Sequence, residues 1–217
     1  MDNISKLYKV RFSKADLVKK NKIWKMLCKY FFQKFIPYES TVLDLATGYG
    51  EFINNIDTKS KLAVDLNGDA INYLKPDVTF YKQNASDMKS IKSNSIDVVF
   101  VSNFFEHLPS KEVMDDVLVE INRVLKKSGK FMLMQPNIRY ETSRYWDYYD
   151  HIIPLSHMSF TEALLKADFK IEEVIPKFVP FSTDSKYPTF NFFIWLYLKM
   201  PFAWQFFGKQ FFIIAKK

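Results

Sequence analysis

The sequence predicts an α/β fold in which a mostly parallel sheet has helices on both faces. Short apolar runs alternate with stretches of helical periodicity through the middle of the chain. Runs such as Val98–Val101 are apolar at consecutive positions, which is typical of strands buried on both sides. The chain has 217 residues, a length that suits one domain. We expect a helical cap over residues 1–40, a central unit over 41–137, and an insertion, the last strands and an aromatic segment over 138–217.

Seven strands are expected. Five are short apolar runs in the central unit: Thr41–Leu45, Lys61–Asp65, Val78–Lys82, Ile96–Val101 and Lys130–Gln135. Two more, Lys170–Phe178 and Gln210–Ala215, are expected to complete the sheet as an antiparallel pair with a long connection. Helical spacing of apolar residues predicts helices near Ala15–Phe35, Glu51–Ile56, Asp69–Leu74, Ser110–Leu125 and Thr161–Ala167. The segment Ile138–Pro154 lacks either period and indicates a long irregular insertion.

Composition excludes several classes of protein. The net charge of +7 comes from scattered lysines, which favours a soluble surface over a nucleic-acid interface. Cys28 is the only cysteine, so we expect neither a disulfide framework nor a thiolate metal cluster. The three histidines are far apart in the sequence, and no metal site is expected. The polar N-terminus does not resemble a signal peptide, so a cytoplasmic setting is expected.

The segment Thr41–Phe52, TVLDLATGYGEF, is the first place to look for a ligand site, because ligands of such sheets bind at the carboxyl ends of strands. Gly48 and Gly50 let a ligand approach the backbone and allow positive φ. A dinucleotide site would need a third glycine, and that position is Ile53. Asp44, before the turn, is a poor neighbour for pyrophosphate but a good partner for a cationic amine.

VLDLATGYGEF resembles the first motif of the class I S-adenosylmethionine-dependent methyltransferases, D/E-x-G-x-G-x-G, with Ala46 in place of the first glycine. LAVDLN places Asp65 where that family binds the ribose hydroxyls, and QNASDM resembles the stretch beside adenine, with Asn84 where Asp is commonest. SIDVVFVSNFFEHL and VLKKSGKFMLMQPN resemble the fourth and fifth strands with their loops. The matches follow one another in order from Thr41 to Asn137.

The resemblance implies a Rossmann-like class I methyltransferase fold, with S-adenosylmethionine as cofactor and S-adenosylhomocysteine as product. Arg11, in the N-terminal segment, is expected either to pair with the methionine carboxylate of the cofactor or to be solvated. The residues expected to bind the cofactor are Asp44, Ala46, Gly48, Gly50, Asp65, Leu66, Asn84, Ala85, Ser102 and Arg11.

The methyl acceptor is expected to meet the loops after strands four and five and the insertion. RYWDYYDHIIPLSH, residues 144–157, interleaves aromatic rings with carboxylates and histidines, which suits a sugar ring and its hydroxyls. His151 is the first candidate for general base, because its unperturbed pKa lies near neutral, and Asp150 or Asp147 is expected to orient it. His107 is the second candidate, with loop packing as its alternative role. The expected substrate-binding residues are Tyr145, Trp146, Asp147, Tyr149 and His157.

Other activities fit the sequence less well. Adenine-N6 methyltransferases carry an Asn/Asp-Pro-Pro-aromatic tetrad where this chain has residues 102–105, SNFF. Cytosine-C5 enzymes need a nucleophilic cysteine, and Cys28 lies in the predicted first helix. A nicotinamide-dependent reductase would need a third glycine in the first loop, and this sequence lacks it. A methyltransferase acting on nitrogen or oxygen of another small metabolite stays open, as does a non-catalytic protein that binds the cofactor.

The C-terminal segment is unusually aromatic. Its apolar run Phe192–Leu198 is broken by Lys199 and Pro201, and is far shorter than the ~20 residues of a membrane span. It is expected either to cover the core or form a homodimer, or to contact a membrane surface through Trp195 and Trp204. The layout of the chain looks like methyltransferases of polysaccharide and glycolipid assembly, which implies a sugar hydroxyl as acceptor.

Overall fold

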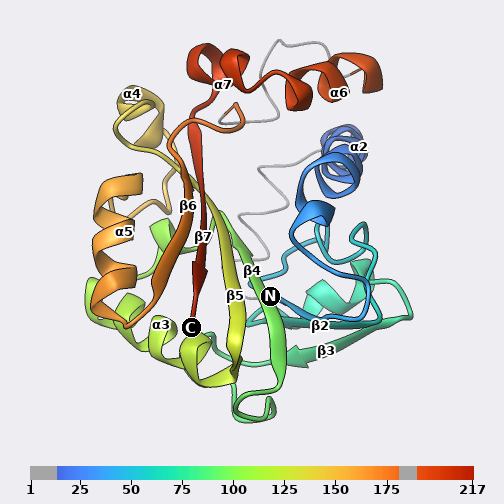
Figure 1. Ribbon diagram of the computed structural model, residues 1–217, viewed down its shortest axis with the longest axis vertical. Helices are drawn as coiled ribbons and strands as arrows, with labels where there is room; N and C mark the ends of the chain where they lie inside the picture. Colours follow the sequence, from blue (N-terminus) through green and yellow to red (C-terminus); the bar gives the residue numbers. More distant parts are fainter. Residues whose placement is uncertain (1–13, 181–189) are drawn as a thin grey trace.

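The computed structural model describes residues 14–180 and 190–217, which form a seven-stranded sheet in the order β3-β2-β1-β4-β5-β7-β6 (Figure 1). Strands β1 to β5 pair in parallel, and β7 is antiparallel to both β5 and β6. The predicted mixed sheet is confirmed. The strands are β1 Thr41–Leu45, β2 Ser60–Asp65, β3 Val78–Lys82, β4 Ile96–Ser102, β5 Leu125–Pro136, β6 Lys170–Ile175 and β7 Gln210–Lys216.

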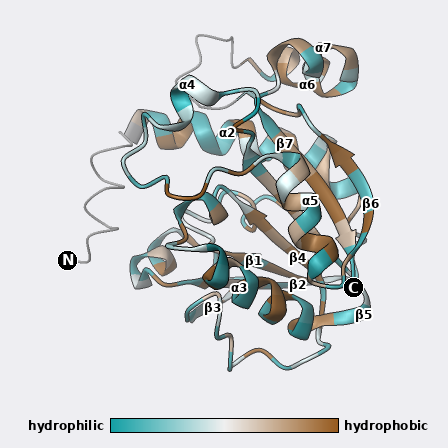
Figure 2. Cartoon of the chain, turned by 90° about the vertical axis from the view of Figure 1, so that its left-hand side faces the viewer, coloured by the Kyte–Doolittle hydropathy of each residue, from teal (hydrophilic) through white to brown (hydrophobic). Residues whose placement is uncertain are grey.

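Helices lie on both faces of this sheet, as predicted (Figures 1 and 2). The α-helices are α2 Lys14–Tyr30, α3 Lys111–Val124, α4 Thr142–Tyr145, α5 His157–Lys166, α6 Asn191–Lys199 and α7 Pro201–Phe207. Three short 3₁₀ helices are η1 Phe32–Lys34, η2 Gly68–Tyr73 and η3 Phe105–His107. Among the described residues, no helix is long and apolar enough to cross a membrane.

The helix expected at Glu51–Ile56 is wrong, because this segment forms consecutive turns. Phe52, Ile53 and Ile56 are buried, so turns satisfy the apolar spacing that predicted the helix. Side chains bond to main-chain oxygens of this segment: Nδ2 of Asn55 donates to Glu51 O, and Nζ of Lys75 donates to Asn54 O. Such bonds compete with the regular helical ladder.

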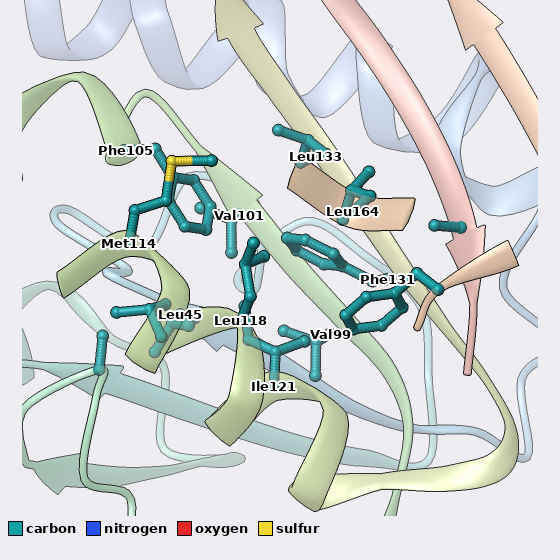
Figure 3. Packing of buried hydrophobic residues seen from close by; sticks show 14 of the residues in the cluster. Leu45, Val99, Val101, Phe105, Met114, Leu118, Ile121, Phe131, Leu133 and Leu164 are labelled. Atoms are coloured by element: carbon teal, nitrogen blue, oxygen red, sulfur yellow. The ribbon is translucent and has the colours of Figure 1, made fainter. Parts of the chain in front are cut away.

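Two hydrophobic clusters fill the two sides of the sheet. On one side, α3 begins at the N-cap Ser110 and buries residues spaced three and four apart, Met114, Val117, Leu118, Ile121 and Val124. Figure 3 shows several of these side chains against Val99, Val101 and Phe131 of the sheet, with Leu164 of α5 beside them. The other side packs α2, η1 and the turn segment against the sheet through rings such as Trp24, Phe32 and Phe100.

The aromatic helices α6 and α7 cover the second cluster with one side only. Leu198 and Trp204 are buried in it, and Ile194 and Tyr197 pack against it. The indole of Trp204 donates to Tyr197 O at 2.8 Å. The expectation that this segment covers the core is thus confirmed, and Trp204 faces the interior, which differs from the surface position it would have in the membrane alternative.

Candidate active site

The loop between β1 and the turn segment has a left-handed backbone at three positions, Ala46 (φ 57°), Gly48 (φ 55°) and Gly50 (φ 70°). Glycine adopts this region readily, whereas a residue with a Cβ is strained there. At Gly50 a Cβ would also lie 2.5 Å from Cδ2 of Leu74. The two glycines are therefore needed for the loop, and Ala46 is held in a strained conformation.

The Asp65 carboxylate, at the end of β2, connects the first two strand-end loops. Its Oδ2 accepts from Gly48 N–H at 2.8 Å, and its Oδ1 accepts from Asn67 N–H at 2.8 Å. Burial raises the pKa of Asp65, and these backbone hydrogen bonds oppose that shift. The Leu66 backbone N–H is a third donor, so of the roughly four acceptor positions of this carboxylate at least one remains for a ligand.

Asp44, near the end of β1, is buried beneath the same loop. The Thr47 hydroxyl donates to its Oδ2 at 2.7 Å. Burial and, to a smaller extent, the nearby carboxylates of Glu51 and Asp65 raise the pKa of Asp44 to about 7, and the Thr47 bond opposes this shift. A cation bound here would relieve this cost, so this part of the fold favours positively charged ligands.

The other predicted cofactor residues follow the neighbouring strands. Leu66 is 51% exposed after β2, and Ser102 is the last residue of β4. Asn84 is exposed, its Oδ1 accepts from Ser86 N–H, and Ala85 beside it is buried. Because β1 to β4 are parallel, these residues share the carboxyl edge of the sheet. Arg11 lies outside the described residues.

The three predicted catalytic residues come together in a second group at this edge. Nδ1 of His107 lies 3.2 Å from Oδ2 of Asp150 and 3.0 Å from its main-chain oxygen. The rings of His107 and His151 are 5.0 Å apart, centre to centre. The Glu106 main-chain oxygen accepts from Ile152 N–H at 2.7 Å, which holds the insertion against the loop after β4. Asp150 thus contacts His107, the second candidate for general base.

Glu106 is a site residue that the sequence analysis missed. Its side chain is only 1% exposed, and burial raises its pKa. Oε2 accepts from the Gln135 amide at 2.6 Å, while Oε1 has no hydrogen-bond partner among the described residues. An acidic residue inside the apolar run FFEHL was the available indication, since a buried carboxylate needs compensation.

The predicted substrate-binding residues divide into two groups. Trp146 and Tyr149 are exposed, at 53% and 94%, and Asp147 is exposed as well. Tyr145 does not fit its predicted role, because it is fully buried and its hydroxyl donates to Ile153 O. It supports the insertion from inside. His157 is half-buried at the start of α5, where its Nδ1 lies 3.0 Å from Nδ2 of Asn137, and burial lowers its pKa.

Comparison with known proteins agrees with this geometry. Residues 43–133 match the family model of a methyltransferase domain. Among solved structures, a SAM-dependent methyltransferase from Archaeoglobus fulgidus is 23% identical, with a TM-score of 0.63 over 89% of this chain and 94% of that one. The methyltransferase bound to the Trm112 methyltransferase activator of Haloferax volcanii is 17% identical, with a TM-score of 0.67 over 93% of this chain and 92% of that one. No curated protein sequence matches the chain.

A third structure, a SAM-dependent methyltransferase from Aquifex aeolicus, is 18% identical, with a TM-score of 0.60 over 100% of this chain and 99% of that one. The fold is thus the Rossmann-like fold of methyltransferases. The family match covers the strands and loops that form the site, and these solved structures are S-adenosylmethionine-dependent methyltransferases, so both comparisons support methyl transfer from S-adenosylmethionine as the chemistry of this site.

Proposed function

We propose that the protein transfers the methyl group of S-adenosylmethionine to a sugar hydroxyl of a glycan or sugar-containing intermediate. The observation that carries this proposal is the meeting of His107, Asp150 and His151, where the last two come from the same insertion as the exposed rings of Trp146 and Tyr149. Aromatic faces stack on the C–H faces of sugars. Methylation of a hydroxyl also requires removal of its proton, for which the histidine cluster is suited.

The cofactor would lie across the loops after β1, β2 and β3. Asp65 would accept from the ribose hydroxyls through the acceptor capacity that its three backbone donors leave. Gly48, Gly50 and the small Ala46 would let the methionine part approach the backbone, with Asp44 near its cationic amine. Leu66, Asn84 and Ala85 would contact adenine, with Ser102 at the opposite wall. Arg11 stays a candidate for the methionine carboxylate.

The aromatic helices lie at the same end of the molecule as the insertion. Pro136, at the end of β5, pairs with Gln210, the first residue of β7, which follows α7 after two residues. Nζ of Lys209 lies 3.2 Å from Oε2 of Glu141, directly before α4. Figure 1 shows α4, α6 and α7 together at this end. A surface bound by α6 and α7 would therefore lie close to the acceptor loop.

The outward side of α6 and α7 has the composition of a membrane-surface element. We call it the aromatic face; its residues Phe190, Phe192, Phe193, Phe202, Phe206 and Phe207 are all exposed. No acidic residue occurs from 190 to 217, while α2, which packs beside α6, has exposed Lys22, Lys25 and Lys29 at helical spacing. Nζ of Lys22 lies 5.9 Å from the Phe190 ring. Rings bordered by lysines match an anionic lipid surface, which we propose as the partner of this face.

The acceptor class is tested by incubating the protein with methyl-labelled cofactor and a panel of glycans, sugar intermediates and unrelated hydroxyl or amine metabolites. Label should appear on a sugar oxygen. His107→Asn and His151→Asn should each lower turnover by about 10²-fold or more, with S-adenosylhomocysteine affinity unchanged. Label only on a non-sugar metabolite would overturn the acceptor class. Cofactor binding without transfer to any member of the panel would favour a non-catalytic binder.

A further inference from the structure

The cluster around Glu106 has the geometry of a metal site, although the spacing of the histidines in the sequence predicts none. Glu106, His107 and His151 each place one ligand atom within 4.8 Å of the other two. Oε1 of Glu106 and Nε2 of His107 are 3.8 Å apart, which is too long for a hydrogen bond. Two ligands of one ion, each about 2.1 Å from it, lie roughly 3–4 Å apart. This separation therefore suits two groups that share a cation.

The groups behind these ligand atoms are arranged as in metal sites. A ligating histidine usually gives its other ring nitrogen to a carboxylate or a main-chain carbonyl, and a ligating carboxylate is itself hydrogen-bonded. Nδ1 of His107 contacts both kinds of acceptor on Asp150, which leaves Nε2 directed toward Glu106. The Gln135 amide holds Oε2 of Glu106, which leaves Oε1 for the ion.

The buried Oε1 of Glu106 is an independent indication of a ligand. It has no hydrogen-bond partner among residues 14–180 and 190–217, and its side chain is 1% exposed. A buried carboxylate oxygen without a donor is costly, and a bound cation would remove that cost.

We propose that Glu106, His107 and His151 bind one divalent transition-metal ion, with Asp150 and Gln135 as positioning residues. Two imidazoles and one carboxylate suit Zn²⁺, Mn²⁺ or Fe²⁺ better than Mg²⁺ or Ca²⁺, which prefer oxygen ligands. Three protein ligands leave open positions for water or substrate.

The chemical role of the bound ion, unlike its binding, rests on the proposed function. With the ion bound, His107 and His151 would promote removal of the acceptor proton as its ligands and not as general bases: a hydroxyl bound to the ion would have a lowered pKa and lose its proton to water. Its oxygen would then form the new C–O bond, while the methyl C–S bond breaks and its electron pair stays on sulfur. The products are the methyl ether, a proton and neutral-sulfur S-adenosylhomocysteine.

The test is direct titration of tag-free protein with Zn²⁺, Mn²⁺ and Co²⁺, using calorimetry and, for Co²⁺, the visible absorption of the bound ion. One equivalent should bind. Glu106→Gln should weaken binding at least 100-fold, because the Gln135 amide would attract the new carbonyl oxygen and leave an NH₂ group facing the ion. His107→Gln should have a similar effect, whereas His157→Gln, a histidine outside the cluster, should bind metal like the wild type.

The wild-type titration decides the outcome even if a variant fails to fold. Absence of binding by folded wild-type protein, or equal binding by folded Glu106→Gln, would overturn the inference. Full methyl transfer to a sugar by metal-free protein in chelator would overturn the chemical role and leave the proposed function intact. A bound ion together with transfer only to non-sugar acceptors would reject the acceptor class and leave the metal site intact.

Discussion

Ala46 is a residue whose conformation costs stability. Its φ of 57° lies in the left-handed region, which costs a residue with a side chain roughly 1–2 kcal/mol. Glycine avoids this strain but loses more backbone entropy on folding, about 0.4–1 kcal/mol. We therefore expect Ala46→Gly to raise the free energy of unfolding by up to about 1 kcal/mol, measured by urea denaturation.

Gly50→Ala is the matched opposite change in the same loop. It introduces a Cβ at φ 70°, 2.5 Å from Leu74, and should lower the free energy of unfolding by roughly 1–3 kcal/mol. If Ala46→Gly proved as destabilising as Gly50→Ala, Ala46 would not carry the strain assigned to it.

Asp44 should make cofactor binding depend on pH. Its pKa of about 7 means that the carboxyl is largely protonated at pH 6 and ionised at pH 8. A cationic ligand favours the ionised form, so binding below the pKa must release a proton and is weakened. Affinity for S-adenosylhomocysteine should rise by roughly tenfold from pH 6 to pH 8 and then level off, as calorimetry can measure.

Asp44→Asn should flatten this pH profile. It should also raise the melting temperature of the ligand-free protein at pH 8, because a carboxyl with a raised folded-state pKa loses stability as pH rises from about 4 toward 7. A steep profile that persisted in the variant would assign the pH dependence to another group.

Strand β5 supports the loop after β4 through one buried side chain. Gln135 donates to Glu106 at 2.6 Å and accepts from Phe104 N–H at 3.0 Å. Gln135→Leu leaves both loop groups unpartnered, so the free energy of unfolding should fall by about 2–4 kcal/mol. Gln205→Leu, an exposed change on α7, should alter it by less than about 0.5 kcal/mol in the same urea experiment. Equal effects would show that Gln135 does not brace the loop.

The central strands could be predicted at the level of elements, because burial on both faces produces continuous apolar runs. Boundaries differed where a local bond decided them: α5 begins at His157, four residues before its predicted start, because Ser156 and Ser159 form a capping box. Strand β6 ends at Ile175, before Pro176 and not at Phe178. The helix predicted at Glu51–Ile56 does not form, because the side chains of Asn55 and Lys75 compete for its main-chain oxygens.

The candidate site was predictable only in part. Motif spacing located the carboxyl-edge residues such as Asp65, since strand order places them together. The pairing of Asp150 with His107, the inward direction of Tyr145 and the orphan oxygen of Glu106 depend on how the insertion folds back on the loop after β4. That contact joins segments more than 40 residues apart, and no local sequence pattern predicts it.

The molecule as a whole should bind anionic vesicles. Flotation with vesicles containing phosphatidylserine or phosphatidylglycerol should recover the protein, recovery should be lower with neutral lipid, and added salt should reduce it because it screens the lysines. Phe202→Ser with Phe206→Ser, both in the aromatic face, should abolish recovery. Val119→Ser, an equally exposed apolar change on α3, should have no effect.

The same variants separate this partner from a second copy of the chain. A wild-type dimer in sedimentation that dissociates in the double variant, together with no vesicle binding, would assign the aromatic face to a homodimer. In that case the lipid proposal fails.

The position of β7 has a consequence for how the chain reaches its native state. β7 lies between β5 and β6 but follows both along the chain, and in the described part of the chain β6 has no other strand beside it. During synthesis β6 therefore emerges without a neighbour, and the edge of β5 stays open until the aromatic helices and β7 have been made. Over that interval the nascent protein exposes an unpaired edge and several phenylalanines, so its yield in the cell should depend on chaperones.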